Sequence, residues 1–277
     1  MEKQTNITPH KTFLISILIT QNGYSFFVLN SETKKIEICK TEELKAADAK
    51  AIFKKLAEEL KQNWTIKFPN AQVQICYHHS YFAVVPSEIF DAEFASDYLK
   101  YNTKIYANDS ISTEVNSDLE LHIPFVPYVN IHNEVLNTYE SIDFTHSINS
   151  SINWAKKLSK NQEGEHAFAF VQKEAFVLVL MENEKLQLAN YFEYQTAEDF
   201  AYFCLFAIQQ NQLDREQMHF SILGDVSIES EMHQLMYTYV KNVVLISFEE
   251  LNFQIDLNSI QKNFFNTNPF LALQLCE

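Results

Sequence analysis

The stretch FLISILITQNGYSFFVLN, residues 13–30, decides the fold class. Its two apolar and aromatic runs, 13–19 and 24–30, flank a turn at Gln21-Asn22-Gly23. Asn-Gly is the strongest short-range signal for a β-hairpin, because both residues tolerate positive φ. The sequence therefore predicts two antiparallel strands joined by a tight turn.

The segments that follow extend this hairpin to a β-β-β-α-β unit. Strands are expected at 35–39 and 73–77. Between them, residues 42–62 predict a helix, since Thr41 is a candidate N-cap and acidic residues follow in the first turn. Apolar side chains recur there at helical spacing, so one face of the helix should pack on the sheet.

The same order of elements returns in the second half of the chain. The repeat comprises strands at 166–172, 175–181 and 185–194, a helix over 197–211 with Thr196 as N-cap, and a strand at 219–224. Repetition of a supersecondary unit indicates the architecture of the whole chain. We therefore expect an α/β fold of two lobes, 1–145 and 146–277, each with a mixed sheet, that face each other across a ligand cleft.

The remaining segments are less regular. Residues 81–86 resemble a strand, and 87–101 resemble helical turns that begin at Ser87. The apolar segment 119–131 is extended, and its prolines should keep it at a sheet edge or outside the sheet. The overlapping segment IPFVPYVNIHNEV, residues 123–135, could serve as an exposed docking strand or groove lining, or as a buried crossover between the lobes. Further elements are expected as strands at 141–146 and 243–248 and as helices at 148–159 and 229–240.

Composition and charge exclude several functional classes. The chain has 277 residues, a net charge of -15 and a single arginine, Arg215. Nucleic-acid binding and anionic membranes are therefore disfavoured, since both require basic surfaces. No apolar run approaches the length of a membrane span, and no secretory signal is visible, so the cytoplasm is expected. The four cysteines lack CxxC spacing, which predicts free thiols.

The order of elements resembles the actin-like ATPase superfamily over nearly the whole chain. That superfamily includes actin, hexokinases, heat-shock chaperone ATPases and cytoskeletal proteins of pili and cell division. A closer resemblance is to a family of Bacteroidetes proteins of about this length, with an actin-like (ribonuclease H-like) fold and a domain of unknown function. The segments that carry this likeness are LISILITQNGYSFFVLN (14–30), IPFVPYVNIHNEV (123–135), FSILGDV (220–226) and NPFLALQLCE (268–277).

The resemblance implies where a nucleotide would bind. In active superfamily members the first hairpin turn carries Asp, Gly and Ser or Thr, and the second carries Asp-x-Gly. Here the first turn offers Asn22, Gly23 and Ser25 without an acid, and the second reads Gln172-Lys173-Glu174 without a glycine. The paired glycines of the adenosine site are reduced to Gly224-Asp225. We expect a degenerate site, because Mg²⁺ needs carboxylate ligands and phosphates need closely approaching backbone amides.

The candidate cofactor-binding residues are therefore Asn22, Gly23 and Ser25 for phosphate and Gly224 and Asp225 for adenosine, all as vestiges. Each also has a plain structural explanation. Asn22-Gly23 would form only a hairpin turn, while Gly224 would permit a turn and Asp225 would cap a helix. No catalytic residue is assigned, and the expected cofactor is none, with ATP and magnesium as the alternative.

Other chemical sites are not supported. His78 and His79, with His132 or Cys76, could suggest a metal site, but adjacent strand residues point to opposite faces. No serine-hydrolase elbow is present.

Three hypotheses remain. The first is a non-catalytic actin-like scaffold or protein-binding module that binds a partner or itself. The second is a divergent ATPase in which Asp225 or Glu174 reaches a phosphate or metal. The third is a sensor that binds a small molecule in the cleft.

Overall fold

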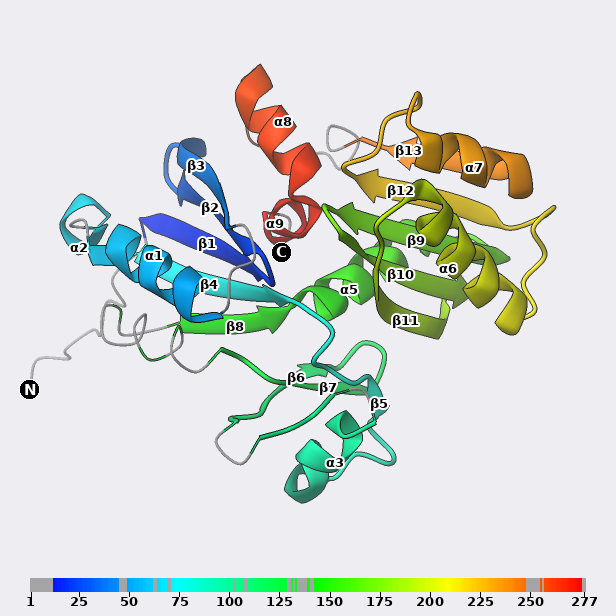
Figure 1. The fold of residues 1–277 in the computed structure, drawn as a ribbon, viewed down its shortest axis with the longest axis horizontal. Coiled ribbons are helices and arrows are strands. Elements are labelled where there is room, and N and C mark those ends of the chain that lie inside the picture. The colour runs from blue at the N-terminus through cyan, green and yellow to red at the C-terminus, as the bar shows by residue number, and fades with distance from the viewer. Residues whose placement is uncertain are drawn as a thin grey trace, which may run out of the picture.

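The structure is a computed structural model, and it describes residues 12–44, 49–61, 64–68, 71–101, 103–106, 109–128, 131, 133, 139, 142–247, 255 and 257–275. Two five-stranded sheets and one three-stranded sheet lie within these ranges. Figure 1 shows the two larger sheets side by side, with helices between them and on their outer faces.

The first large sheet has the order β3-β2-β1-β4-β8. Its strands are β1 (Phe13–Thr20), β2 (Gly23–Asn30), β3 (Lys35–Glu43), β4 (Ala71–His78) and β8 (Ile142–His146). The hairpin strands are antiparallel, whereas β1, β4 and β8 are parallel. Helix α1 (Ala49–Lys61) and the short α2 (Trp64–Lys67) lie against one face in Figure 1. Fully buried Ile52 and Leu56 come from the apolar stripe of α1, as its helical periodicity requires.

The second large sheet repeats the first strand for strand, in the order β11-β10-β9-β12-β13. Its strands are β9 (Glu165–Gln172), β10 (Ala175–Glu182), β11 (Lys185–Glu193), β12 (His219–Gly224) and β13 (Asn242–Ile246). Helices α6 (Ala197–Gln210) and α7 (Glu231–Tyr239) cover its outer face (Figure 1). The predicted N-cap of α6 is confirmed: Thr196 Oγ1 accepts from Asp199 N, and Asp199 accepts from Thr196 N, both at 3.1 Å. The predicted duplication with mixed sheets is therefore confirmed.

Helices between the two sheets join them into one core. Helix α5 (Ser147–Ser159) contacts strands of both sheets, and α9 (Pro269–Gln274) packs on β1, β9 and α5. Every side chain of α9 is buried, and Phe270 and Leu271 are wholly so. Trp154 Nε1 donates to Leu273 O at 3.4 Å. We predicted no helix here, so α8 (Ser259–Thr267) and α9 were missed. The division at residue 145 stays a prediction.

The segment between β4 and β8 forms the small sheet β5-β7-β6. Its strands are β5 (Val85–Pro86), β6 (Ser112–Asn116) and β7 (Leu121–Phe125). The prediction that prolines keep 119–131 at an edge or outside a sheet was wrong, because β7 is the central strand. Pro124 O accepts from Ala83 N at 3.0 Å. The N–H and C=O of a strand residue point toward the same neighbouring strand. For Pro124 this neighbour is β5, which has only two residues. The N–H that proline lacks therefore removes little of the hydrogen bonding between the strands.

The predicted helix 42–62 is shorter than expected, and its N-cap was wrong. Strand β3 continues to Glu43, and α1 begins at Ala49. Thr41 lies opposite Ser25 in the β2–β3 ladder, and their hydroxyls are 2.9 Å apart. The eight residues of β2 offer hydrogen-bond partners along this whole segment. Pairing with β2 therefore outweighs the local helix signal, as tertiary context often does.

Two other helix boundaries differ from prediction. Ser87 lies in a turn, and the helical turns begin later, with a 3₁₀ segment at Ala92–Phe94 capped by Asp91 and then α3 (Ala95–Leu99). Helix α7 begins at Glu231 with Ser230 as N-cap, not at 229. None of the helices in the described ranges is both long enough and apolar enough to cross a membrane. Cys39, Cys76 and Cys204 are free thiols, while Cys276 lies outside the described residues.

Candidate functional site

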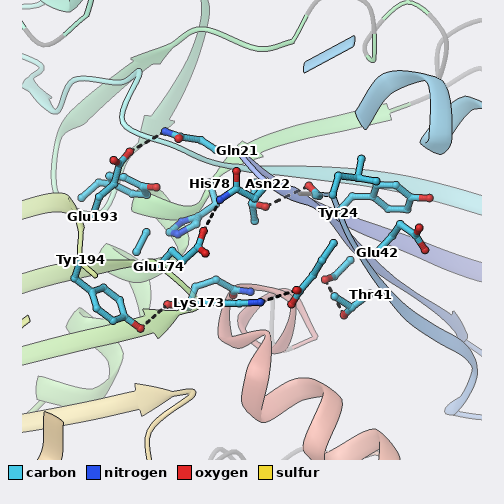
Figure 2. Close-up of a pocket in the computed structure, with 18 of the residues that line it drawn as sticks. Gln21, Asn22, Tyr24, Thr41, Glu42, His78, Lys173, Glu174, Glu193 and Tyr194 are labelled. Atoms are coloured by element: carbon cyan, nitrogen blue, oxygen red, sulfur yellow. Dashed lines mark hydrogen bonds and ion pairs between the residues drawn. The ribbon is translucent and has the colours of Figure 1, made fainter. Parts of the chain in front are cut away.

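A cleft of about 910 Å³ lies where the two hairpin turns of the duplicated units face each other. Figure 2 shows that its walls come from both halves of the chain. The residues lining it are Thr20, Gln21, Asn22, Gly23, Tyr24, Ser25, Thr41, Glu42, Glu43, Leu44 and His78 from the first half, and Gln172, Lys173, Glu174, Ala175, Tyr191, Glu193, Tyr194 and Gln195 from the second. Asn22, Gly23 and Ser25 are thus brought together on the cleft wall, whereas Gly224 and Asp225 are not among its lining residues.

The first turn joins β1 and β2 through Gln21 and Asn22, as predicted. The predicted reason was wrong, however, because Asn22 is not among the described residues with positive φ. Gly23 has an extended φ of 158°, and a Cβ on it would lie 2.2 Å from the Glu42 carbonyl oxygen. Glycine is therefore required here for the close approach of β2 to β3.

The second turn keeps a left-handed conformation without a glycine. Glu174 has a φ of 65°, which costs a residue with a side chain about 1–2 kcal/mol. Two hydrogen bonds from Tyr194 hold the turn: its backbone N donates to Glu174 O and its hydroxyl donates to Gln172 O, each at 3.1 Å. Glu174 therefore has the backbone conformation that usually requires glycine, although it carries a carboxylate side chain.

Polar contacts connect the two halves of the chain across the cleft (Figure 2). Asn22 Nδ2 donates to the Glu174 carboxylate. Gln21 Nε2 donates to Glu193 Oε1 at 2.9 Å. Lys173 Nζ forms an ion pair with Glu43 Oε2 at 2.5 Å, but both side chains are more than half exposed. Side chains of the first turn thus donate to the second turn and to the last residue of β11.

The lining of the cleft is acidic. Four glutamates and one lysine line it, and the lysine, Lys173, forms an ion pair with Glu43. Burial, followed by the charges of Asp225 and Glu174, raises the pKa of Tyr194 to about 12. Burial and then the charge of Glu193 likewise raise the pKa of Tyr191. Both tyrosines are therefore neutral donors in a negative field.

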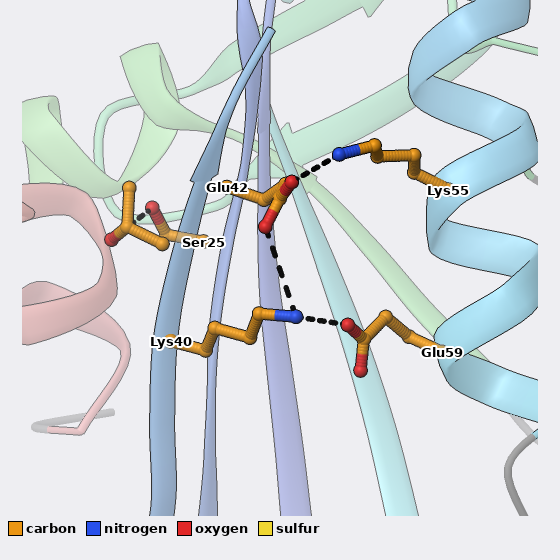
Figure 3. A network of polar contacts seen from close by, with 6 residues as sticks. Ser25, Lys40, Glu42, Lys55 and Glu59 are labelled. Atoms are coloured by element: carbon orange, nitrogen blue, oxygen red, sulfur yellow. Dashed lines mark hydrogen bonds and ion pairs between the residues drawn. The ribbon is translucent and has the colours of Figure 1, made fainter.

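One of the four glutamates belongs to a separate ion network between β3 and α1, shown in Figure 3. Glu42 accepts from Lys55 and lies 3.8 Å from Lys40 Nζ, which also pairs with Glu59. The hydrogen bond from Lys55 lowers the pKa of Glu42. Glu174 and Glu193, in contrast, accept only from side-chain amides within the described part of the chain.

Two buried polar side chains also line the cleft without completing their hydrogen bonds. His78 is 1% exposed, and its ring packs on Phe270 and Tyr191 at centroid distances of 4.3 and 4.9 Å. Its Nδ1 lies 2.9 Å from Ser147 Oγ, but its Nε2 has no partner among the described residues. Burial, and then the nearby His79, lowers the pKa of His78 to about 3. The imidazole is therefore neutral.

Gln172 is the second such side chain, and it is 9% exposed. Its Nε2 donates to Asn268 Oδ1 at 3.4 Å, while its Oε1 has no partner among the described residues. The Asn268 amide donates in turn to Phe264 O at 2.8 Å, which fixes the orientation of the network. Neither His78 nor Gln172 was predicted to bind a ligand in the cleft. The only signal was their position at the end of a predicted strand that leads toward the cleft.

Gly224 and Asp225 lie at the end of β12 and contact the backbone of β9. Gly224 has a φ of 116°, and a Cβ on it would lie 2.0 Å from Val171 O and 3.1 Å from Pro269 Cγ. Asp225 N donates to Val171 O at 3.1 Å. The expectation that Asp225 caps a helix was wrong, because α7 begins several residues later with Ser230 as its cap. A role of these two residues in binding adenosine stays a prediction.

His78 is the last residue of β4 and His79 lies in the bend that follows, so the expectation that both lie on a strand was wrong. His79 packs on Tyr81 and Tyr128, and its Nδ1 lies 3.4 Å from His146 Nε2. The described residues contain no group of three or more His, Cys, Asp or Glu side chains that could hold a metal ion. His132, the other histidine considered, lies outside the described residues.

One known protein family matches most of the chain. The family described as protein of unknown function (DUF3822) matches residues 2–243. The chain belongs to the DUF3822 family. Among curated proteins, no sequence matches this DUF3822 chain.

Solved structures confirm the fold of this DUF3822 protein. A Bacteroides thetaiotaomicron protein with actin-like ATPase fold and unknown function superposes with a TM-score of 0.78, at 19% identity, over 98% of this chain and 99% of that one. A chain of the PilM–PilN type IV pilus biogenesis complex superposes with a TM-score of 0.58, at 12% identity, over 96% of this chain and 99% of that one. At these identities the likeness establishes the actin-like fold, which confirms the predicted fold class and family resemblance.

Proposed function

We propose that this DUF3822 protein is a non-catalytic actin-like module that binds a protein partner, with a cleft that does not hold Mg-ATP. One observation carries the proposal: the two turns that would hold phosphates bond to each other through Asn22 and Glu174. Gln21 of the first turn also donates to Glu193, the last residue of β11. A nucleotide would have to break both contacts before its phosphates could reach the turn amides.

The charge of the cleft supports the same conclusion. A triphosphate is strongly anionic, and its transfer depends on positioning and electrostatic stabilisation by metal ions and basic groups. The cleft offers one lysine, Lys173, and that lysine is held by Glu43. Two of the lining carboxylates, Glu174 and Glu193, accept hydrogen bonds from separate side-chain amides.

Binding of a protein is supported by the outer helices of the second sheet. Tyr202 and Phe206 on α6 are 61% and 49% exposed, and their rings stack at 5.9 Å. Tyr237 on the adjacent α7 is 66% exposed. Exposed aromatic side chains are enriched at protein interfaces. A structural neighbour, PilM–PilN, is itself a complex of two proteins. The net charge of -15 disfavours nucleic acid as the partner.

Calorimetric titration of the full chain with Mg-ATP and Mg-ADP tests the proposal, together with a phosphate-release assay. We expect no heat of binding at micromolar nucleotide and no release above the rate of buffer alone. Micromolar affinity for nucleotide, or release of phosphate above the rate of buffer alone, would contradict the proposal.

A divergent ATPase is the second candidate, because Glu174 lies on the cleft and the charge of Asp225 reaches both Lys173 and Tyr194. This candidate requires that the double variant Glu174→Ala/Asp225→Ala lose phosphate release. Turnover that is unchanged in that variant would eliminate these residues as ligands of metal or phosphate.

A further inference from the structure

We propose that the outer face of helices α6 and α7 binds a segment of another protein that carries arginine or lysine beside apolar side chains. The inference rests on the proposed function, because it names the surface and the partner chemistry of the protein-binding module. Helices α6 and α7 pack on each other over the outer face of the second sheet (Figure 1). No residue of the cleft takes part.

A stripe of side chains at every fourth position follows the exposed side of α6. Its members Glu198, Tyr202, Phe206 and Gln210 are all exposed, and this spacing places them on one side of the helix. The two rings stack at 5.9 Å with an interplanar angle of 18°. The opposite side of the helix is buried on the sheet. Tyr202 and Phe206 therefore form one apolar surface that faces solvent.

The duplicated fold shows that a helix in this position does not require exposed aromatic rings. Helix α1 occupies the same place in the first unit, between its third and fourth strands. The large exposed side chains in the described part of α1 are Lys54, Lys55 and Glu58. A charged outer side is usual for a helix that only covers a sheet. The contiguous rings of α6 therefore indicate a surface that a partner covers.

Neighbouring rings hold this aromatic surface in place. Phe203 contacts the ring of Tyr202 edge-on at 5.5 Å and packs on Phe192 of β11 at 5.1 Å. On α7 the exposed ring of Tyr237 stacks on the buried His233 at 6.0 Å. Side chains that are already ordered lose little conformational freedom when a partner binds. The rings are therefore suited to act as anchors of an interface.

The charges of the two helices select the partner. Helices α6 and α7 contain Glu198, Asp199 and Glu231 but no lysine or arginine. A guanidinium or ammonium group is attracted by the carboxylates and by the faces of the tyrosine and phenylalanine rings. A second copy of this chain brings the same acids and a net charge of -15, so self-association is disfavoured. An anionic membrane is repelled for the same reason.

Panning a phage-displayed library of random linear peptides on the immobilised full chain tests the chemistry of the partner. We expect the enriched peptides to combine arginine or lysine with leucine, phenylalanine or tryptophan. A synthetic peptide of an enriched sequence should bind the chain with a dissociation constant below about 100 μM. Enriched peptides without basic residues, or a library that yields no enrichment, overturn the inference.

A matched pair of variants tests the location of the surface. Tyr202→Gln/Phe206→Gln removes the two rings of α6. Phe94→Gln/Tyr101→Gln removes one phenylalanine and one tyrosine, 52% and 92% exposed, beside α3. We expect the α6 variant to bind the synthetic peptide about tenfold or more weakly and the α3 variant to bind it like the wild type. All four side chains are exposed, so both variants should keep a Tm close to that of the wild type.

Two further measurements test the other occupants of this face. A dimer in light scattering that dissociates in the α6 variant would identify a second copy of the chain as the occupant. Co-sedimentation with phosphatidylcholine vesicles that is lost in the same variant would identify a lipid surface. Either result overturns the inference.

The inference and the proposed function fail separately. An enriched peptide that binds the α6 variant as tightly as the wild type contradicts only this inference, because the chain still binds a protein segment. Binding of Mg-ATP in a parallel calorimetric titration contradicts the proposed function instead.

Discussion

Mild acid should unfold this protein, because buried neutral histidines cannot take up protons in the folded state. Burial lowers the pKa of His78 from 6.5 to about 3 and that of His79 from 6.5 to about 4. In the unfolded chain both imidazoles regain the ordinary pKa of about 6.5. Below that pH the unfolded chain binds protons that the folded chain does not bind. The free energy of unfolding therefore falls as the pH falls.

The size of the loss follows from the two pKa shifts. Each proton taken up only by the unfolded chain changes the free energy of unfolding by about 1.4 kcal/mol per pH unit. His78 and His79 together then remove about 5 kcal/mol between about pH 6.5 and about pH 4.5. His146, whose pKa is lowered by burial and then by His79 and His78, adds to the loss. The total stability of a domain is about 5–15 kcal/mol, so the transition should occur in this range.

Urea unfolding followed by tryptophan fluorescence, at intervals from neutral pH down to about pH 4.5, measures this dependence. The variant His78→Gln keeps a polar partner for Ser147 but removes one titrating group. Its free energy of unfolding should change by about 1.4 kcal/mol per pH unit less than that of the wild type. A wild-type free energy that stays constant between about pH 6.5 and about pH 5 would refute the reasoning.

Thermal unfolding of three variants, with a surface substitution as control, tests contacts in the core, at the end of β12 and across the cleft. Phe270→Ala removes a wholly buried ring of α9 and should cost about 3–5 kcal/mol, or about 10 °C in Tm, whereas Phe206→Ala on the surface should change Tm little. Gly224→Ala places a Cβ 2.0 Å from the Val171 carbonyl oxygen and should cost about 3 kcal/mol or more. Lys173→Met breaks an exposed ion pair and should cost less than about 1 kcal/mol. A Phe270→Ala protein with wild-type Tm would contradict the role of α9.

Predictions that rest on local pattern were the accurate ones. The hairpin at 13–30 and the strands of the second unit were predicted because alternation, β-branched residues and a two-residue turn act within a few residues of each other. The same holds for the N-cap Thr196, whose partner Asp199 is three residues away. The duplication followed from comparing these local patterns. No long-range contact was needed to recognise it.

Predictions failed where a distant partner decides the local structure. Thr41 carries a helix N-cap signal, but pairing with Ser25 across the β2–β3 ladder keeps it in a strand. Helix α9 is short and has no polar face, so no amphipathic periodicity could reveal it. It is stabilised by burial between β1, β9 and α5, which lie far from it in the sequence.

The sequence alone determined the fold class, the family resemblance and the residue types of the two turns, with no acid in Gln21-Asn22-Gly23 and no glycine in Gln172-Lys173-Glu174. These properties are recorded in residue types at fixed short spacings. Only the tertiary structure decided that Asn22 bonds to Glu174, and that the buried His78 Nε2 and Gln172 Oε1 have no hydrogen-bond partner among the described residues. Hydrogen bonding in the cleft depends on which side chains from both halves of the chain meet there, and no spacing along one segment specifies that meeting.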